Sequence, residues 1–298
     1  MLKIDRLSMD YHGGICALDS VDLEIGTGMF GLLGPNGAGK STLMRILATL
    51  QTPTSGGATL DGIELADSPM RARPVIGYLP QDVGAYPRVT AWELLDYLAG
   101  LRGIGPAHER KRRVREQLGR VNLIDAADRR VDTYSGGMLQ RLGIATIFLA
   151  EPRLVIVDEP TAGLDPTERR RFQCLLAEAA GDCVLLLSSH IVEDVAGLCE
   201  RMAIMDQGRV VASGDPAELV RSLAGKVGVK RVGFDELDHW KRKIRLISWR
   251  PERGRLLLRA RDERLEDHGF ERAEPDLEDF YSLSLKQEAS AAVGAGVR

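Results

Sequence analysis

A glycine-rich run near the N-terminus has the residue types and spacing needed to hold phosphate groups. Residues 34–41 match the pattern G-x-x-x-x-G-K-[ST] at every fixed position. The glycines let successive backbone N–H groups point inward at phosphate oxygens, and a helix beginning near Lys40 would add the positive end of its dipole. Lys40 would reach the β- and γ-phosphates, and the Ser41 hydroxyl would ligate Mg²⁺. The residues predicted to contact nucleotide here are Gly34, Pro35, Asn36, Gly37, Ala38, Gly39, Lys40, Ser41 and Thr42.

The alternative for this run is a glycine-rich turn between a strand and a helix that binds nothing. Such a turn would not need the lysine. The run therefore predicts a site for a nucleoside triphosphate.

Two consecutive acids follow a strongly apolar segment. Residues 154–157 are Leu-Val-Ile-Val, and Asp158 and Glu159 come directly after them. A buried strand would deliver both carboxylates to the edge where sites in open α/β sheets lie. There Asp158 is suited to holding Mg²⁺ beside Ser41, and Glu159 to orienting the attacking water or accepting its proton. Acids also end strands without any function, but together with the phosphate-binding run the catalytic interpretation is favoured.

The elements that must position these residues alternate between strands and helices. We expect a helix over 138–149, a strand over 154–157, a helix over 167–179 and a strand over 184–188. This order predicts an α/β fold with a parallel sheet flanked by helices. Earlier in the chain, short strands and a turn at Asp61-Gly62 predict a hairpin.

Composition restricts the class of protein. The chain has 298 residues, of which 44% are hydrophobic and 28% charged, so it has enough apolar residues to form a large core. Its 40 basic and 43 acidic residues give a net charge of −3, and we expect no nucleic-acid partner. No apolar run approaches the roughly 20 residues of a membrane-spanning helix. Three of the four cysteines lie in apolar surroundings, so we expect buried free thiols rather than disulfides or metal ligands.

A third motif makes the chain comparable with a known family. Residues 134–138, Tyr-Ser-Gly-Gly-Met, stand where the nucleotide-binding subunits of ABC transporters carry their signature Leu-Ser-Gly-Gly-Gln, and Ser189-His190 follows in the family's order. Over about residues 1–220 the chain resembles these subunits. The resemblance implies a P-loop NTPase cassette in residues 1–222, with a parallel-sheet core, an antiparallel β subdomain and a helical insertion at about 85–150. A small α+β appendage at 223–286 and a disordered tail at 287–298 would complete the chain.

The resemblance also implies roles for four further residues. Tyr11 would stack on adenine, although an exposed tyrosine at a strand end is a serious alternative. Gln81 would reach the Mg²⁺ and the attacking water, and His190 would contact the γ-phosphate. Asp165 would lie at a dimer interface, and its sequence Asp-Pro-Thr-Glu is also that of a helix N-cap with Pro at N1 and Glu at N3.

The signature residues imply a dimer. In the family, Ser135, Gly136 and Gly137 of one subunit close onto the γ-phosphate held by another, at the N-terminus of a helix. Tyr134 and Met138 depart from the consensus, and Met138 cannot make the hydrogen bonds of the usual amide. Because the chain contains one copy of each motif, it would need a second nucleotide-binding subunit, either identical or different.

A membrane partner is implied as well. The family docks its membrane helices near residues 82–97, so the chain would be a cytoplasmic ATPase, peripheral on the inner face of the cell membrane through a separate permease. Residues 274–281, Glu-Pro-Asp-Leu-Glu-Asp-Phe-Tyr, resemble an element of ABC-2-type exporters and favour export. A soluble ABC ATPase that is not coupled to transport and a nucleotide sensor with little turnover are the alternatives.

The phosphate-loop prediction is tested by Lys40→Ala. Loss of the ammonium should weaken ATP binding by roughly 10- to 100-fold, because a hydrogen bond to a charged group contributes about 1.5–3 kcal/mol. Equilibrium titration with labelled ATP measures the affinity. Near-normal binding would contradict the assignment.

Overall fold

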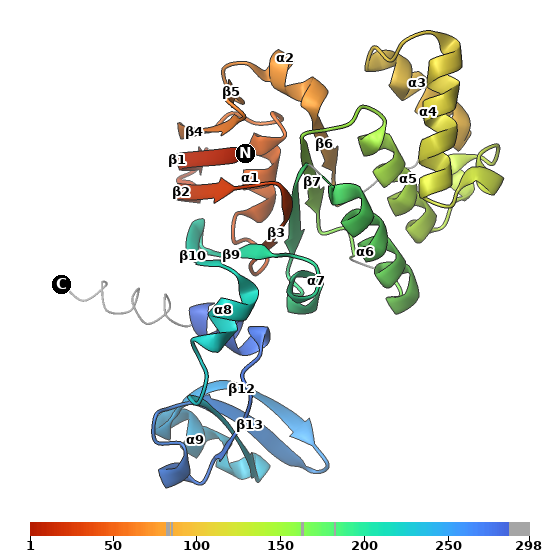
Figure 1. Cartoon of the computed structure of the whole chain (residues 1–298). Helices are drawn as coiled ribbons and strands as arrows, with labels where there is room; N and C mark the ends of the chain where they lie inside the picture. Colours follow the sequence, from red (N-terminus) through yellow and green to blue (C-terminus); the bar gives the residue numbers. More distant parts are fainter. Residues whose placement is uncertain (82–83, 85, 162–163, 182, 286–298) are drawn as a thin grey trace. The chain divides into compact units, whose positions relative to one another are not determined.

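The computed structural model describes residues 1–81, 84, 86–161, 164–181 and 183–285 (Figure 1). The chain divides by packing into two compact units, Met1–Val210 and Val211–Arg298. The cassette and appendage boundaries set by the sequence, 1–222 and 223–286, stay predictions, and the predicted tail at 287–298 lies outside the described residues.

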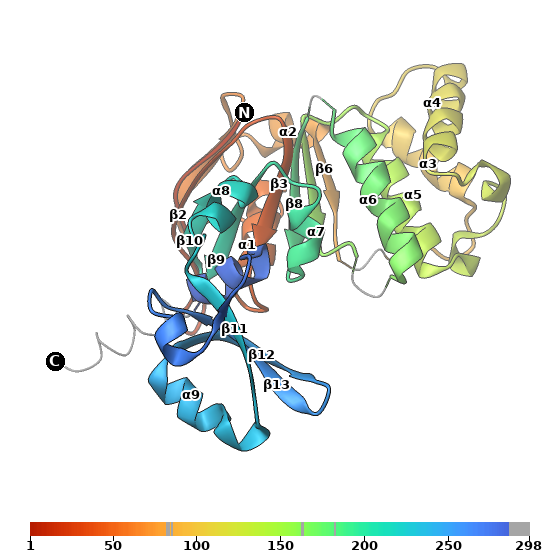
Figure 2. The same cartoon turned by 60° about the horizontal axis from the view of Figure 1, so that its bottom comes forward.

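A six-stranded sheet forms the centre of the first unit. The strands at its middle are parallel, and β7 and β8 are buried along their whole length, as expected for strands covered on both faces. Figure 2 shows β3 and β8 side by side. In spatial order the strands are β10 (Arg209–Gly214), β9 (Arg201–Asp206), β3 (Gly28–Leu33), β8 (Val184–Ser189), β7 (Leu154–Asp158) and β6 (Ile76–Leu79).

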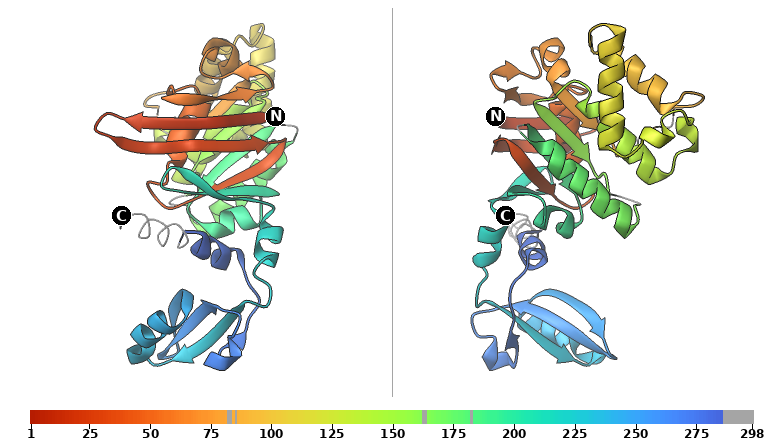
Figure 3. Two further views of the ribbon diagram at one scale, coloured as in Figure 1. Left: turned by 90° about the vertical axis from the view of Figure 1, so that its left-hand side faces the viewer. Right: turned by 45° about the vertical axis from the view of Figure 1, so that its right-hand side comes forward.

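An antiparallel sheet lies beside this core, and its long strands β1 and β2 are seen in red in Figure 3. Helix α1 (Lys40–Leu47) packs its buried face, including Leu43, Met44 and Leu47, into one apolar core with both sheets. The predicted hairpin at Asp61-Gly62 is confirmed, because β4 and β5 pair antiparallel across it. The order is β2 (Ile15–Ile25), β1 (Leu2–Tyr11), β4 (Ser55–Leu60) and β5 (Ile63–Glu64).

The helical insertion is present and its first helix is defined by a local signal. Thr90 and Glu93 form a reciprocal capping box at the start of α3. The insertion contains α3 (Ala91–Leu101), α4 (Ala107–Arg120) and α5 (Gly136–Phe148), with short 3₁₀ turns at Ile124–Ala126 and Val131–Thr133. The other helical segments of the unit are α2 (Pro69–Ala72), the 3₁₀ turn Arg73–Val75, α6 (Pro166–Ala180) and α7 (Val192–Ala196). Among the described helices, none has both the length and the apolar character to span a bilayer.

The second unit has its own small antiparallel sheet with apolar clusters on both faces. Trp240 of α9 packs with Leu246 and Leu258, whereas Ile247 faces Leu223 and Leu283. The sheet order is β12 (Arg245–Glu252), β13 (Arg255–Arg261), β11 (Val227–Val232) and β14 (Glu271–Arg272). Its helical segments are α8 (Pro216–Arg221), α9 (Leu237–Lys243), the 3₁₀ turns Phe234–Glu236 and Glu266–His268, and a helix over 277–285. The predicted α/β P-loop fold with an α+β appendage is confirmed.

The cysteine prediction is wrong for part of the set. All four cysteines are free, but Cys16 and Cys174 are exposed, and only Cys183 and Cys199 are buried. Cys174 is followed by two leucines in α6 but lies on the exposed side of that helix. The Cys199 thiol has a pKa raised to about 12 by burial, which keeps it protonated and unreactive.

Two glycines with similar backbone angles provide a test of the antiparallel sheet. Gly56 has a φ of 72° and lies opposite the part of β1 where the register with β4 shifts. A Cβ on Gly56 would lie 2.1 Å from the carbonyl oxygen of Arg6. Gly62 (φ 81) has no atom within 4 Å of such a Cβ.

Gly62→Ala should therefore cost only the left-handed strain, about 1–2 kcal/mol, in the free energy of unfolding. Gly56→Ala should cost roughly 1–3 kcal/mol more, because backbone must move to admit the methyl group. Urea unfolding of both variants measures the difference. Equal losses would contradict the close approach of β1 and β4.

Candidate functional site

The glycines of the phosphate loop are required by close backbone approaches. A Cβ on Gly34 would lie 2.5 Å from the carbonyl oxygen of Met205, and one on Gly39 would lie 2.5 Å from that of Ala17. Gly39 also has a φ of 99° and is the N-cap of α1. The loop between β3 and α1 can therefore keep this tight path only with glycine at both positions.

Lys40 is the centre of the site's positive charge. Its side chain is 4% exposed, and its ammonium donates hydrogen bonds to the carbonyl oxygens of Gly34 (2.7 Å) and Pro35 (3.1 Å). It also pairs with the Glu159 carboxylate at 3.5 Å. Burial lowers the pKa of Lys40, and the nearby Glu159 opposes that shift. The ammonium is thus held in the loop with its charge matched by a carboxylate.

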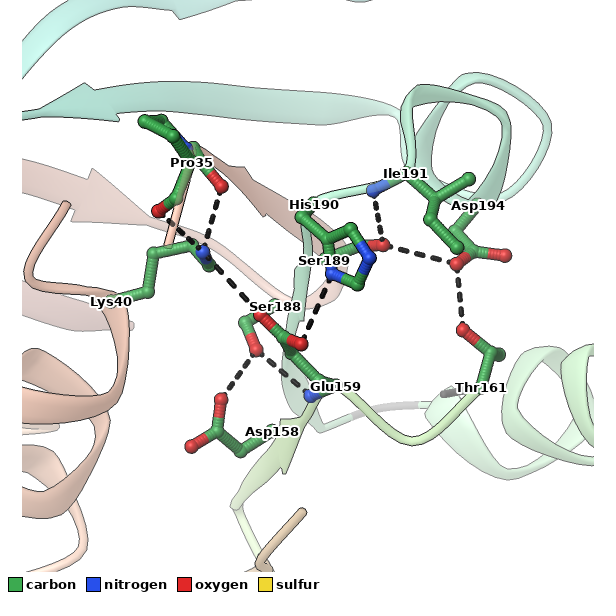
Figure 4. A network of polar contacts seen from close by, with 11 residues as sticks. Pro35, Lys40, Asp158, Glu159, Thr161, Ser188, Ser189, His190, Ile191 and Asp194 are labelled. Carbon is green, nitrogen blue, oxygen red and sulfur yellow. Dashed lines mark hydrogen bonds and ion pairs between the residues drawn. The ribbon is translucent and has the colours of Figure 1, made fainter. Parts of the chain in front are cut away.

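Asp158 is the last residue of β7, as predicted, and it is 3% exposed. The Ser188 hydroxyl donates to Asp158 Oδ1 at 2.7 Å and accepts from the backbone N–H of Glu159 at 2.9 Å (Figure 4). Ser188 lies beside Asp158 in the register of β7 and β8. One hydroxyl therefore fixes the side chain of the first acid and the backbone of the second.

Glu159 turns sharply away from the strand. Its φ of 46° lies in the left-handed region, which costs a non-glycine residue about 1–2 kcal/mol. Its Oε2 lies 3.0 Å from Nδ1 of His190, and its Oε1 lies toward Lys40. Figure 4 shows the carboxylate between the ammonium and the imidazole. Lys40 and His190, which are far from Glu159 in the sequence, therefore both contact its carboxylate.

A pocket of about 420 Å³ opens over the phosphate loop, within the range of small-molecule sites. Tyr11 and Gln81 reach it from other elements, and Glu159 closes one wall. The Tyr11 hydroxyl shares a hydrogen bond with the Thr42 hydroxyl and donates to Gln51 Oε1, and these two contacts lower the pKa of that tyrosine. The lining is Tyr11, Ile15, Cys16, Ala17, Asn36, Gly37, Ala38, Gly39, Lys40, Ser41, Thr42, Gln81 and Glu159.

The signature residues and Asp165 do not line this pocket. Ser135 is the N-cap of α5 and accepts from the N–H of Met138, and both Ser135 and Gly136 are exposed. Gly137 is buried in the first turn of that helix. Asp165 caps α6, accepting from the N–H groups of Thr167 and Glu168, so its predicted capping role is confirmed.

The departure at Tyr134 has a structural explanation. The ring is 8% exposed, and its hydroxyl donates to the carbonyl oxygen of Ala126 at 2.7 Å. Tyr134 thus replaces the apolar consensus residue as a buried side chain that is anchored by one hydrogen bond.

Ser188 is the residue that sequence reasoning missed at the site's centre. A serine inside a buried strand has no local signal, and its role depends on the register that sets it beside Asp158. Only the proximity of Ser189-His190 in sequence could have drawn attention to it.

The donor set at the site fits magnesium. Within the described residues, no group of three or more His, Cys, Asp or Glu side chains could hold a metal ion by itself. Mg²⁺ is usually held by one or two protein oxygens together with nucleotide phosphates. The Asp158 carboxylate and the Ser41 hydroxyl are hard oxygen donors of that kind.

Comparison with known proteins agrees with this geometry. The sequence model of a family described as ABC transporter matches residues 18–162. The chain is 38% identical over 224 residues, 74% of its length, to an uncharacterized ABC transporter ATP-binding protein of Nostoc sp., and covers 66% of that protein. It is 36% identical to the linearmycin resistance ATP-binding protein of Bacillus subtilis, covering 66% of this chain and 63% of the relative. It is also 38% identical to the daunorubicin/doxorubicin resistance ATP-binding protein of Streptomyces peucetius, over 72% of this chain and 66% of the relative. The chain thus matches slightly less than two thirds of the length of these relatives.

Solved structures agree as well. An ATP-binding subunit of an ABC transporter is 31% identical with a TM-score of 0.67, covering 74% of this chain and 92% of that one. A dimeric ATP-binding cassette in a post-hydrolysis state, bound to ADP and Pi, is 27% identical with a TM-score of 0.66, covering 72% and 98%.

A phosphate loop on a parallel sheet, with an acid pair at the end of a strand two positions away in the same sheet, defines the P-loop NTPase class. The chain belongs to the ATP-binding proteins of the ABC transporter family. Proteins of this family bind ATP.

The role of Tyr11 can be separated from that of an ordinary strand-end tyrosine. Because stacking on a base contributes about 1–3 kcal/mol, Tyr11→Ala should weaken ATP binding by roughly 5- to 150-fold. Tyr11→Phe keeps the ring and removes the hydrogen bonds to Thr42 and Gln51, so its affinity should stay within about threefold of the wild type. Equilibrium titration with ATP gives both values. Equal behaviour of the two variants would remove the stacking role.

Proposed function

We propose that the chain is the ATP-hydrolysing subunit of an ABC-type membrane exporter and that it works by ATP-driven dimerisation. The observation that carries the proposal is the meeting of Lys40, Glu159 and His190 beside the phosphate loop, with contacts of 3.5 Å and 3.0 Å at one carboxylate. An ion pair between Lys40 and Glu159 that served only the fold would need no third partner. His190, whose side chain is 44% exposed, nevertheless contacts the same carboxylate.

Each group has a distinct role in hydrolysis. Lys40 neutralises the β- and γ-phosphates, and Glu159 orients the attacking water or accepts its proton. His190 contacts the γ-phosphate and keeps the Glu159 carboxylate aimed at the site. Asp158 and Ser41 would hold Mg²⁺, which would supply charge neutralisation at the phosphates. Gln81, which also lines the pocket, would reach the ion as well.

The second half of each site comes from another subunit. Ser135 and Gly136 present exposed polar backbone at the N-terminus of α5, a suitable group for a γ-phosphate. Asp165 is exposed at the start of α6 and would lie at the interface. ATP between two such surfaces would hold the dimer, and hydrolysis would release it. A homodimer would have two complete sites, and a heterodimer is the alternative.

A cleft in the helical insertion is the proposed docking place for a permease. It is mainly apolar, about 120 Å³, and lies between the end of β6, α3 and α5, with Tyr78, Gly84, Tyr86 and Leu142 in its wall. Tyr86 in this wall is 48% exposed, and Tyr97 of α3 is 64% exposed. Residues 82, 83 and 85 of the predicted docking segment lie outside the described residues. Through this contact the subunit would sit on the inner face of the cell membrane.

The direction of transport is argued from two features. Two of the relatives are named as ATP-binding proteins of linearmycin resistance and of daunorubicin/doxorubicin resistance. The second feature is the segment of the appendage at residues 274–281, whose sequence resembles an element of ABC-2-type exporters. Its Asp279 is 2% exposed and pairs with Arg259 at 2.7 Å. A soluble ABC ATPase without a transport partner is the alternative, and copurification of a membrane subunit distinguishes the two.

The catalytic assignment is tested by Glu159→Gln. The amide keeps the shape of the side chain but cannot accept a proton from water, so turnover should fall by at least about 100-fold while ATP binding persists. The variant should also form a dimer in ATP that the wild type forms only transiently. Phosphate release and analytical ultracentrifugation measure the two effects. An unchanged rate of ATP hydrolysis would contradict the catalytic role proposed for Glu159.

A further inference from the structure

A second buried carboxylate lies behind the catalytic group. Asp194, in the short helix α7, is 1% exposed. Its Oδ2 accepts from the hydroxyls of Thr161 (2.7 Å) and Ser189 (3.0 Å), as Figure 4 shows. Its Oδ1 accepts from Arg169 Nε (2.6 Å) and from the amide of Gln173 (2.9 Å).

These four donors come from three different segments. Thr161 follows Glu159 by two residues, Ser189 directly precedes His190, and Arg169 and Gln173 lie on α6. The Ser189 hydroxyl also accepts from the N–H of Ile191 at 2.9 Å, so it fixes the backbone on both sides of His190. One carboxylate therefore joins the segments that carry both partners of the 3.0 Å contact between Glu159 and His190.

We propose that Asp194 is a positioning residue for ATP hydrolysis. It holds the segments that carry Glu159 and His190 in a fixed position against α6. This inference rests on the proposed function. Asp194 touches neither the phosphate loop nor its pocket, so it acts through the two residues that do the chemistry.

The charge on Asp194 is essential to this arrangement. A buried carboxylate is stable only when it is paired and its oxygens are hydrogen-bonded, and Arg169 provides the pairing. With an amide in its place, the NH₂ group must face either Arg169 and Gln173 or the hydroxyls of Thr161 and Ser189. In the first case donors oppose donors, and in the second both hydroxyls lose their acceptor. In either orientation, the amide would bind one of the segments less tightly than the carboxylate does.

Asp194→Asn is the first test, performed on the full chain. We expect kcat for ATP hydrolysis to fall about tenfold, because small misplacements of catalytic groups slow the chemical step, while KM for ATP and the affinity for a fluorescent ATP analogue stay within about twofold. Thr161→Val is the second, because it removes one hydroxyl donor without changing charge or volume much. It should lower kcat about threefold with the same unchanged affinity.

Asp279→Asn is the matched control. Asp279 is 2% exposed and is paired with Arg259, whose side chain is 23% exposed, whereas Asp194 and Arg169 are 1% and 27% exposed. We expect this control to lower the melting temperature as much as Asp194→Asn does but to keep the wild-type kcat.

The outcomes separate this inference from the proposed function. A wild type that does not hydrolyse ATP, or a Glu159→Gln variant that equals it, overturns the proposed function. If those two behave as expected, wild-type kcat in both Asp194→Asn and Thr161→Val overturns the positioning role. So does a parallel loss of kcat and ATP affinity, or an equal loss of kcat in Asp279→Asn. If Asp194→Asn does not fold, Thr161→Val alone decides.

Discussion

The arrangement of the candidate site depends on the alignment of three parallel strand ends. Lys40 follows β3, Glu159 follows β7 and His190 follows β8, and these strands are neighbours in the order β3-β8-β7. Parallel strands end at the same edge, so side chains far apart in sequence converge there. The buried ammonium of Lys40 needs a countercharge, and Glu159 supplies it at 3.5 Å. The register of the sheet therefore sets both the electrostatics and the chemistry of the site.

Strained backbone at this edge is supported by its neighbours. Glu159 adopts a φ of 46°, and its N–H is held by Ser188. The phosphate loop curls through glycines whose positions no side chain could occupy, because backbone carbonyls of Met205 and Ala17 approach them closely. In both places long-range packing maintains a conformation that the local sequence only permits.

The second unit is stabilised by its own apolar clusters and by charge. Trp240 and Phe270 pack edge to face at 5.4 Å, and Lys230 lies 4.0 Å from the centre of the Trp240 ring. The acidic and basic halves of its sequence meet where Arg259 of β13 pairs with Asp279, and this contact raises the pKa of that arginine. The carboxylate of this ion pair is buried, whereas the Arg259 side chain is 23% exposed.

The sequence by itself determined the features that depend on local backbone geometry: the phosphate loop, the acids at the end of β7, the hairpin at Asp61-Gly62 and the cap at Asp165. The tertiary structure alone decided the burial of each cysteine, the role of Ser188 and the convergence of four donors on Asp194. The reason is physical. Loops, caps and turns are fixed by residues within a few positions of one another, whereas strand order and register depend on packing between distant segments, which a single sequence does not reveal.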